Sequence, residues 1–514
     1  MLSAKQESVA TELWQDKGVQ LIQLCSVQSA VNKSCKALND ITYISGSLEN
    51  ERQLTPFQSF LCKLAQICDT VKGGDTITAL VALKTASGPE YLFGSNNRSE
   101  MELKDTRKFL HGFLEYVGRN PDGLKKKAMQ KQILWRALEF NFPKVKFYLK
   151  RTLALLGECI NLHVQLEGNS RSEIVLRLRQ LEALATFPYD ILSSQNAKNK
   201  FLRDSETFIK AIQATSENGF SKTIEELTQD VRPGVPDAWS ELRHYFGRLH
   251  SYRQAADSIF EASQTWPELF TVFTVNYVRS ARPLKISLPR PMLRPEQVIK
   301  AAFPDTDMDE YRPHLELLRR FGLDKNIQEK LRQKSMKRVV HCEVLLHSFL
   351  VRNHGADASE YWNNSMFIAT SKQPCRLCHY YFADADNDFQ VQSSHMNVYP
   401  KWRLPDIHEG QNEEEVEHQE ELLDDIIEQM QDDILRIVRN KLPQGKTHDS
   451  RTGPQSMVSG YTGLERRHVP QRNSGPFVGP SGYLGRANSS DVLSETSSFD
   501  DLDDGDSWSP GAAV

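Results

Sequence analysis

The sequence predicts an α/β protein in which a mixed central sheet, flanked by helices, is interrupted by a large all-helical insertion. Two regions that are far apart in the chain carry strand-like runs, one at 76–94 and the other at 366–371. The residues between them, 101–330, are patterned as successive helices. At 514 residues, the chain is long enough for two or more packed units.

The N-terminal part predicts the beginning of the sheet. Residues 1–53 form a helical segment of mixed periodicity. In 54–68, apolar residues recur at three- and four-residue spacing, which predicts an amphipathic helix. Two β-rich runs at 76–83 and 91–94, joined by a Ser-Gly-Pro turn, then predict a hairpin. We therefore assign 54–100 to the first part of the core.

The predicted insertion, 101–330, consists of helices separated by Pro, Gly and Asn residues. We expect helices at 104–118, 122–139, 143–166, 171–186, 200–214, 237–262 and 312–335. Residues 280–296 contain four prolines and predict an extended connector that returns the chain to the core.

Two short motifs contain the side chains best suited to chemistry. His-Cys-Glu at 341–343 opens an apolar run that predicts a buried helix, and Pro-Cys-Arg-Leu-Cys at 374–378 follows the strand-like run. Three soft ligands leave a tetrahedral Zn²⁺ one open position, which is typical of a catalytic site rather than a structural one. The candidate ligands are His341, Cys375 and Cys378.

The spacing within both motifs has physical reasons. Glu343 lies near the start of the same helix as His341, where it can reach a water on the metal and transfer protons. A Cys-x-x-Cys pair at a helix N-terminus places both sulfurs on one side of the first turn, where the helix dipole favours thiolates. Pro374 suits the beginning of that helix because its missing N–H would have no intrahelical partner.

The alternative is a closed structural Cys₃His site with Cys342 as the fourth ligand. Adjacent helical residues point about 100° apart, so His341 and Cys342 are poorly placed to bind one ion. We expect His347, His379 and His395 to be core or surface residues, with His379 the best placed of them to face a substrate.

The H-x-E…P-C-x-x-C arrangement occurs in zinc-dependent nucleobase deaminases. With the surrounding residues 371–378 and 397–405, the chain resembles the cytidine-deaminase-like superfamily. Within it, the chain is similar to a mostly fungal branch related to bacterial toxin-type deaminases. The resemblance covers about 335–406 and implies a zinc-binding core at 331–410 that deaminates a nucleobase in a nucleic acid or nucleotide, with Glu343 as the catalytic residue.

The resemblance also bears on the first part of the core. The deaminase fold begins with a helix, a strand, a turn and a strand directly before its H-x-E helix, so here the insertion separates the two parts. Asn96 or Asn97, at the end of the second strand, would then face the substrate. The alternative for these residues is a loop-capping role.

The uneven charge bears on the substrate. Residues 409–514 hold 21 acidic and 9 basic side chains, a net charge of −12, which leaves +8 on residues 1–408 of a chain whose total is −4. A basic body fits RNA or single-stranded DNA, which we expect over a free nucleotide. Solvated helix faces and a solubilising tail explain the charge equally well.

Basic stretches within the insertion allow two interpretations. Residues 125–136 and 144–151 interleave basic and aromatic side chains, and 319–338 is basic. Such mixtures can grip phosphates and stack bases. They also occur on exposed helix faces that cover apolar neighbours.

The C-terminal part has two sections. Residues 411–442 predict an acidic amphipathic helix that closes the sheet or, alternatively, binds a partner. Residues 443–514 are rich in Gly, Ser, Pro and Asp and predict a disordered acidic tail. No secretory segment or membrane-length apolar run is evident, and eight cysteines in so long a chain do not make a disulfide scaffold. We expect a cytoplasmic or nuclear protein with no membrane partner; the sequence does not identify a protein partner.

Three hypotheses about function follow. The protein is an active deaminase, a zinc-stabilised binding module that has lost turnover, or a helical interaction protein with a vestigial deaminase-like piece. Glu343 favours the first, because a purely structural site has no use for an acid that is not a ligand.

Overall fold

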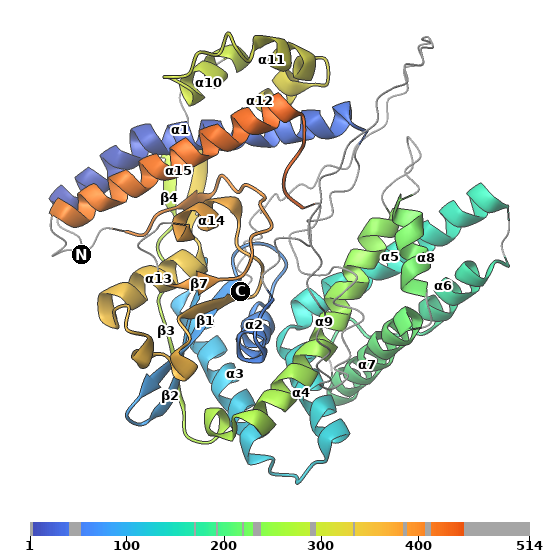
Figure 1. Cartoon of the computed structure of the whole chain (residues 1–514). Coiled ribbons are helices and arrows are strands. Elements are labelled where there is room, and N and C mark those ends of the chain that lie inside the picture. The colour runs from blue at the N-terminus through green and yellow to red at the C-terminus, as the bar shows by residue number, and fades with distance from the viewer. Residues whose placement is uncertain are drawn as a thin grey trace, which may run out of the picture.

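A five-stranded mixed sheet has helices on both of its faces (Figure 1). The computed structural model describes residues 4–40, 53–168, 171–191, 194–217, 220–229, 238–287, 294–332, 335–383, 388–406 and 413–446. The strand order is β3-β2-β1-β6-β7, with β1 antiparallel to both of its neighbours and the two outer pairs parallel. The predicted α/β class is confirmed.

The first part of the core contains α2 (Pro56–Cys68), β1 (Thr78–Thr85) and β2 (Gly88–Ser95). Thr55 begins α2 with a capping box, in which its side chain accepts from the Gln58 N–H and the Gln58 side chain accepts from the Thr55 N–H. β1 pairs with β6 (Phe367–Thr370). The predicted union of the two distant strand regions in one sheet is therefore confirmed.

Alternation along the strands divides the interior into two cores. Leu80 and Ala82 of β1 point to a cluster that contains α2 and the helices of the insertion. Ala79 and Val81 point to the opposite face, where both cysteines of the C-x-x-C motif are buried. The candidate site therefore belongs to the face of the sheet opposite α2 and the first helices of the insertion.

Seven helices of the insertion lie on the side of the first face, where α9 packs on α2 and contacts most of the others (Figure 1). They are α3 (Glu100–Arg119), α4 (Lys126–Phe140), α5 (Phe142–Glu167), α6 (Glu173–Ala183), α7 (Gln195–Glu217), α8 (Phe220–Gln229) and α9 (Ala238–Thr265).

The prediction of an all-helical insertion is wrong in its last part. After the 3-10 helix η2 (Pro267–Phe270), β3 (Thr274–Tyr277) pairs in parallel with β2 and extends the sheet. β4 (Leu284–Ser287) lies in the predicted connector and pairs with β5 (Ser335–Val340). Both strands have only four residues, which is too short for alternation to distinguish them from loop.

The predicted helix at 312–335 is also divided. The chain forms α10 (Pro295–Ala302), α11 (Arg312–Arg319) and α12 (Leu323–Leu331). Gly322 separates the last two because its φ of 86° is left-handed and cannot continue a right-handed helix.

The remaining elements complete the site's surroundings. A second sheet has the order β4-β5-β8 and is built partly from residues of the predicted zinc-binding core. Between 342 and 403, the chain forms α13 (Cys342–Asn353), η3 (Ala358–Glu360), η4 (Trp362–Asn364), α14 (Arg376–Phe382), β7 (Gln390–Val391) and β8 (Trp402–Arg403).

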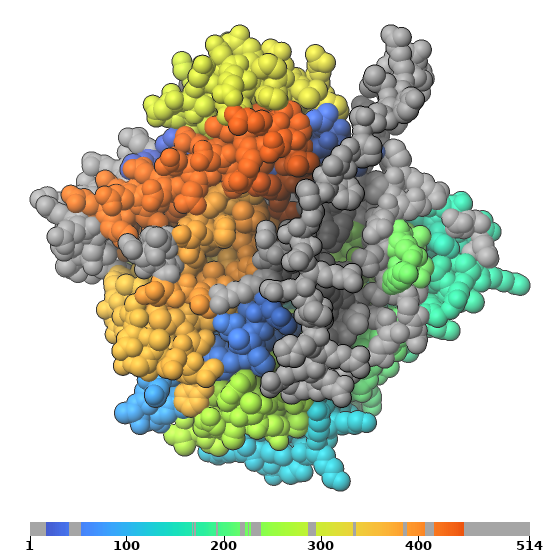
Figure 2. Space-filling model, viewed as in Figure 1, coloured from blue at the N-terminus to red at the C-terminus, as the bar shows by residue number. Residues whose placement is uncertain are grey.

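The two long terminal helices, α1 (Ala4–Leu38) and α15 (Glu413–Asn440), lie side by side (Figure 1). The apolar stripe of α15 is buried, and the helix packs chiefly against α1, with α14 and α11 as further contacts. The expectation that it closes the sheet is wrong, because its apolar face is used by other helices. In the space-filling view, α15 lies between α10–α12 and the part with the C-x-x-C motif (Figure 2).

Of the predicted tail, only 443–446 are among the described residues, and 447–514 lie outside them. The predicted boundaries between the parts of the chain stay predictions. Across the described ranges, no helix combines the length and the apolar character needed to cross a bilayer.

Candidate metal centre

The candidate ligands lie at the ends of two strands. His341 follows β5 directly and is the N-cap of α13, and Cys375 is the N-cap of α14, after β6. His341 Nδ1 lies 3.6 Å from Cys375 Sγ and 3.3 Å from Cys378 Sγ, and the two sulfurs are 3.6 Å apart. The structure therefore brings the three predicted ligands together from two separate motifs.

These separations fit one tetrahedral zinc ion. Bond lengths of about 2.3 Å to sulfur and about 2.0 Å to nitrogen place two sulfurs about 3.8 Å apart and a sulfur about 3.5 Å from a nitrogen. Both thiols are buried and His341 is half-buried. Among the described residues, these three form the cluster whose donor atoms could hold a metal ion, and they leave one tetrahedral position open.

The charges of the cluster also favour a cation. Burial raises the pKa of Cys375, but hydrogen bonds from Cys378 and His341 and the imidazole charge outweigh this and hold that pKa well below its usual value. Burial and the neighbouring Cys375 raise the pKa of Cys378 well above its usual value. Burial lowers the pKa of His341, but Cys375 and Glu343 more than offset it, and the net shift is upward. Two buried thiols thus cannot both ionise easily unless a cation lies between them.

Glu343 lies beside the cluster without being one of its donors. Its side chain is 4% exposed, and Oε2 accepts from the Cys342 thiol at 3.3 Å. A hydrogen bond to Glu343 also contributes to the raised pKa of Cys378, so the carboxylate lies next to that sulfur. Cys342 directs its own sulfur at Glu343 and is not a member of the cluster, which argues against the closed Cys₃His alternative.

Asn96 and Asn97 have different surroundings. Asn96 is buried, and its Oδ1 accepts from the Cys342 N–H at 2.7 Å while its Nδ2 donates to Gly74 O at 2.8 Å. It therefore caps the first turn of α13, next to His341. Asn97 is exposed and donates to Asp75 Oδ1 at 3.1 Å. Substrate contact by either residue stays a prediction.

Sequence reasoning missed the role of Arg376, the residue after Cys375. Its side chain is fully buried, and Nη1 lies 2.6 Å from Asp433 Oδ2 of α15. Nε donates to Met396 O at 3.1 Å, and the backbone N–H donates to Asn397 O at 3.0 Å. α14 is thus held by α15 and by the loop before β8. No local signal marks an arginine inside C-x-x-C as buried, because its partner lies 57 residues away.

The three other histidines are not among the candidate donors. His347 Nδ1 lies 2.8 Å from the Tyr381 hydroxyl, within a group of aromatic rings, and His395 is buried with Nδ1 accepting from the Asn397 N–H. His379 lies on the exposed side of α14. This agrees with the expectation that they are core or surface residues.

Some side chains of the predicted basic stretches have partners inside the protein. Trp135 Nε1 donates to Glu206 at 2.8 Å, and Lys144 is buried. The Tyr148 hydroxyl accepts from Arg248. Arg338, in the third stretch, is buried and donates to the carbonyls of Gly18 and Pro400, and burial lowers its pKa to about 10. These particular side chains are therefore engaged within the protein, and contact of the stretches with a nucleic acid stays a prediction.

The arrangement of a buried Cys₂His cluster beside an acid that is not a ligand defines a deaminase-like segment. Residues 340–406, which contain all four side chains, match the model of the family described as OTT_1508-like deaminase. This segment is therefore similar to a deaminase family, in agreement with the resemblance that its motifs predicted. No curated protein and no solved structure matches the chain.

Proposed function

We propose that the protein is a zinc-dependent hydrolase that deaminates a nucleobase, and that its substrate is RNA or single-stranded DNA. The observation that carries the proposal is the position of Glu343, a buried carboxylate next to Cys378 that is not needed as a ligand. A structural zinc site needs only its ligands, whereas hydrolysis needs a group that moves protons.

His341, Cys375 and Cys378 would hold the ion. Zinc bound there would supply Lewis acidity that makes a water molecule acidic near neutral pH. Glu343 takes one proton from the attacking water and gives it to the ring nitrogen, and it then carries the second proton, from the newly formed hydroxyl group, to the departing amine. A C–O bond forms, the C–N bond breaks and ammonia leaves, so that water is consumed and an amidine becomes a carbonyl.

The polymer substrate is supported by charge and by the outer surface of α5. Lys72 is exposed and its Nζ lies 4.5 Å from the centre of the Phe147 ring, while Lys150 is exposed with its Nζ 5.1 Å from the centre of the Tyr189 ring. Lysines beside aromatic rings suit a flexible strand with phosphates and bases. The net charge of +8 on residues 1–408 also favours binding of a polyanion.

The second candidate is a deaminase-fold binding module without turnover. The observation in its favour is how firmly the site is built into the protein, with Arg376 and Asn96 buried and both bonded to other elements. Such anchoring serves a structural ion equally well.

Ammonia release from a panel of nucleosides, nucleotides, RNA and single-stranded DNA decides between these candidates. Release from a single-stranded polymer, with binding that weakens steeply as salt rises, supports the proposal. Release from free cytidine or a nucleotide, with salt-insensitive oligonucleotide binding, replaces the polymer by a small substrate. Zinc-loaded protein with no release from any member supports the binding module.

A further inference from the structure

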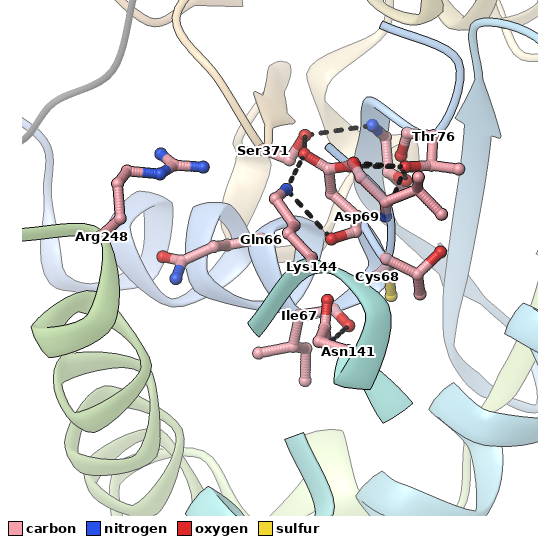
Figure 3. A network of polar contacts seen from close by, with 12 residues as sticks. Gln66, Ile67, Cys68, Asp69, Thr76, Asn141, Lys144, Arg248 and Ser371 are labelled. Atoms are coloured by element: carbon pink, nitrogen blue, oxygen red, sulfur yellow. Dashed lines mark hydrogen bonds and ion pairs between the residues drawn. The ribbon is translucent and has the colours of Figure 1, made fainter. Parts of the chain in front are cut away.

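A polar hub at the end of α2 joins the helical insertion to the loop that carries Cys375 (Figure 3). Side chains from other elements bind three consecutive carbonyls at this helix end, which a helix leaves without intrahelical partners. Asn141 Nδ2 donates to Ile67 O at 2.7 Å, Arg98 Nη2 donates to Cys68 O, and Lys144 Nζ donates to Asp69 O at 3.1 Å.

The centre of the hub is a buried ion pair between the insertion and the core. Lys144 Nζ, from α5, lies 2.5 Å from Asp69 Oδ2, and the two side chains are 2% and 0% exposed. Thr76 Oγ1 donates to the other carboxylate oxygen at 2.7 Å. Burial would raise the pKa of Asp69, but the charges of Lys144 and Lys372 and the hydrogen bonds lower it, so the carboxylate is ionised.

Ser371 connects this ion pair to the candidate metal site. Its Oγ donates to Asp69 Oδ2 at 3.3 Å and accepts from the Thr78 N–H at 3.1 Å, and its own N–H donates to Thr78 O at 2.9 Å. Ser371 follows β6 directly, and residues 371–375 run from it to Cys375. The first residue of the ligand loop is therefore fixed by β1 on one side and by Asp69 on the other.

We propose that Lys144 is a positioning residue of the metal site: by holding Asp69, it fixes Ser371, and so the insertion sets how tightly His341, Cys375 and Cys378 bind their metal. The inference rests on the proposed function only in requiring that this cluster binds zinc. Without Lys144, the buried Asp69 carboxylate loses the partner of its ion pair and keeps only the smaller effect of the Lys372 charge, which favours uptake of a proton or a turn toward water. Either change disturbs the hydrogen bond from Ser371, and metal binding tolerates displacements of only about 0.2 Å.

The test is the zinc affinity of the full chain, measured by competition with a chromophoric chelator. Lys144→Met and Ser371→Ala are each expected to weaken binding about tenfold, the lower end for residues that support metal ligands. Because both act along one path, the double variant should bind zinc no more weakly than Lys144→Met alone. Unchanged affinity in Lys144→Met, or losses that multiply to about a hundredfold in the double variant, would overturn the inference.

A matched control separates positioning from general loss of stability. Leu178→Ala removes a fully buried side chain from α6, outside the hub, and should lower the melting temperature without changing zinc affinity. In cobalt-loaded protein, the thiolate-to-metal absorption should shift in Lys144→Met and not in Leu178→Ala. The same shift in both variants would make Lys144 an ordinary stabilising residue.

A second variant keeps the inference testable if Lys144→Met does not fold. Asp69→Asn with Lys144→Met removes both charges, while the amide oxygen can still accept from Ser371. Affinity close to that of the unaltered protein is expected, and a tenfold loss would contradict the proposed path. If the unaltered protein binds no zinc, the proposed function fails; if it binds zinc and all these variants bind equally well, only this inference fails.

Discussion

Removing the Asp433 carboxylate should destabilise the protein and loosen the C-x-x-C helix together. Asp433 on α15 faces Arg376 at 2.6 Å, and their side chains are 11% and 0% exposed. In Asp433→Ala, the guanidinium stays buried with neutral acceptors, among them Gln444 Oε1 at 2.7 Å, Met396 O at 3.1 Å and the Tyr380 hydroxyl at 3.4 Å. Breaking one side of such a pair costs about 3–5 kcal/mol, and the neutral acceptors that stay in place favour the lower end.

The assay is thermal unfolding followed by near-UV circular dichroism, with zinc content measured on the same samples. A loss of about 3 kcal/mol corresponds to a fall in melting temperature of about 6–12 °C for a cooperative unit of about 200 residues. The matched control is Asp424→Ala on the same helix, whose partner Lys17 lies at 2.8 Å in an exposed pair that should contribute little. Equal melting temperatures for the two variants would refute the reasoning.

Two further predictions concern the metal and the pH. Purified protein should contain about one zinc per chain, and Cys375→Ser should lose both the zinc and part of the thermal stability, because metal binding is coupled to folding. Elemental analysis and melting curves measure both quantities. A metal-free preparation with full stability and activity would contradict this prediction. Burial would raise the pKa of Asp69, but Lys144 and Lys372 lower it, so its contribution to stability is complete above the unfolded value of about 3.9 and is lost as pH falls through the folded value. Melting temperatures below about pH 4 should therefore fall less steeply in the Asp69→Asn, Lys144→Met double variant than in the unaltered protein, and parallel curves would argue against the ion pair.

The sequence predicted those parts of the fold whose signals are local. The helix at 56–68 has its capping box within four residues, and the hairpin of β1 and β2 has clear β-rich runs around a turn. The same is true of the site, since His341, Cys375 and Cys378 each lie in a short motif with fixed spacing. Local patterns suffice where one element supplies its own signal.

The parts that were missed depend on contacts between distant residues. β3 has four residues with one buried side chain, and only its parallel pairing with β2 makes it a strand. β5 contains Lys337 and Arg338, which end the basic stretch 319–338 and lie beyond the helix predicted at 312–335; Arg338 is buried, where it donates to the carbonyls of Gly18 and Pro400. Neither partner can be inferred from the neighbouring residues.

The same limit applies to the surroundings of the metal centre. Asn96 was predicted to face substrate or cap a loop, and the structure places it at the N-terminus of α13, 246 residues away in sequence. The apolar stripe of α15 was recognised, but a stripe does not tell which surface it covers, and α1 rather than the sheet is its main partner.

The most direct test of the central claim is Glu343→Gln, with zinc content and ammonia release measured on the same protein. Gln keeps the size of the side chain and can still form hydrogen bonds, but it cannot take a proton from water. The account predicts an unchanged zinc content and a loss of turnover of at least about a hundredfold. Undiminished turnover would show that Glu343 is not the proton-transfer group, and loss of zinc would make it a ligand, which contradicts the roles assigned to His341, Cys375, Cys378 and Glu343.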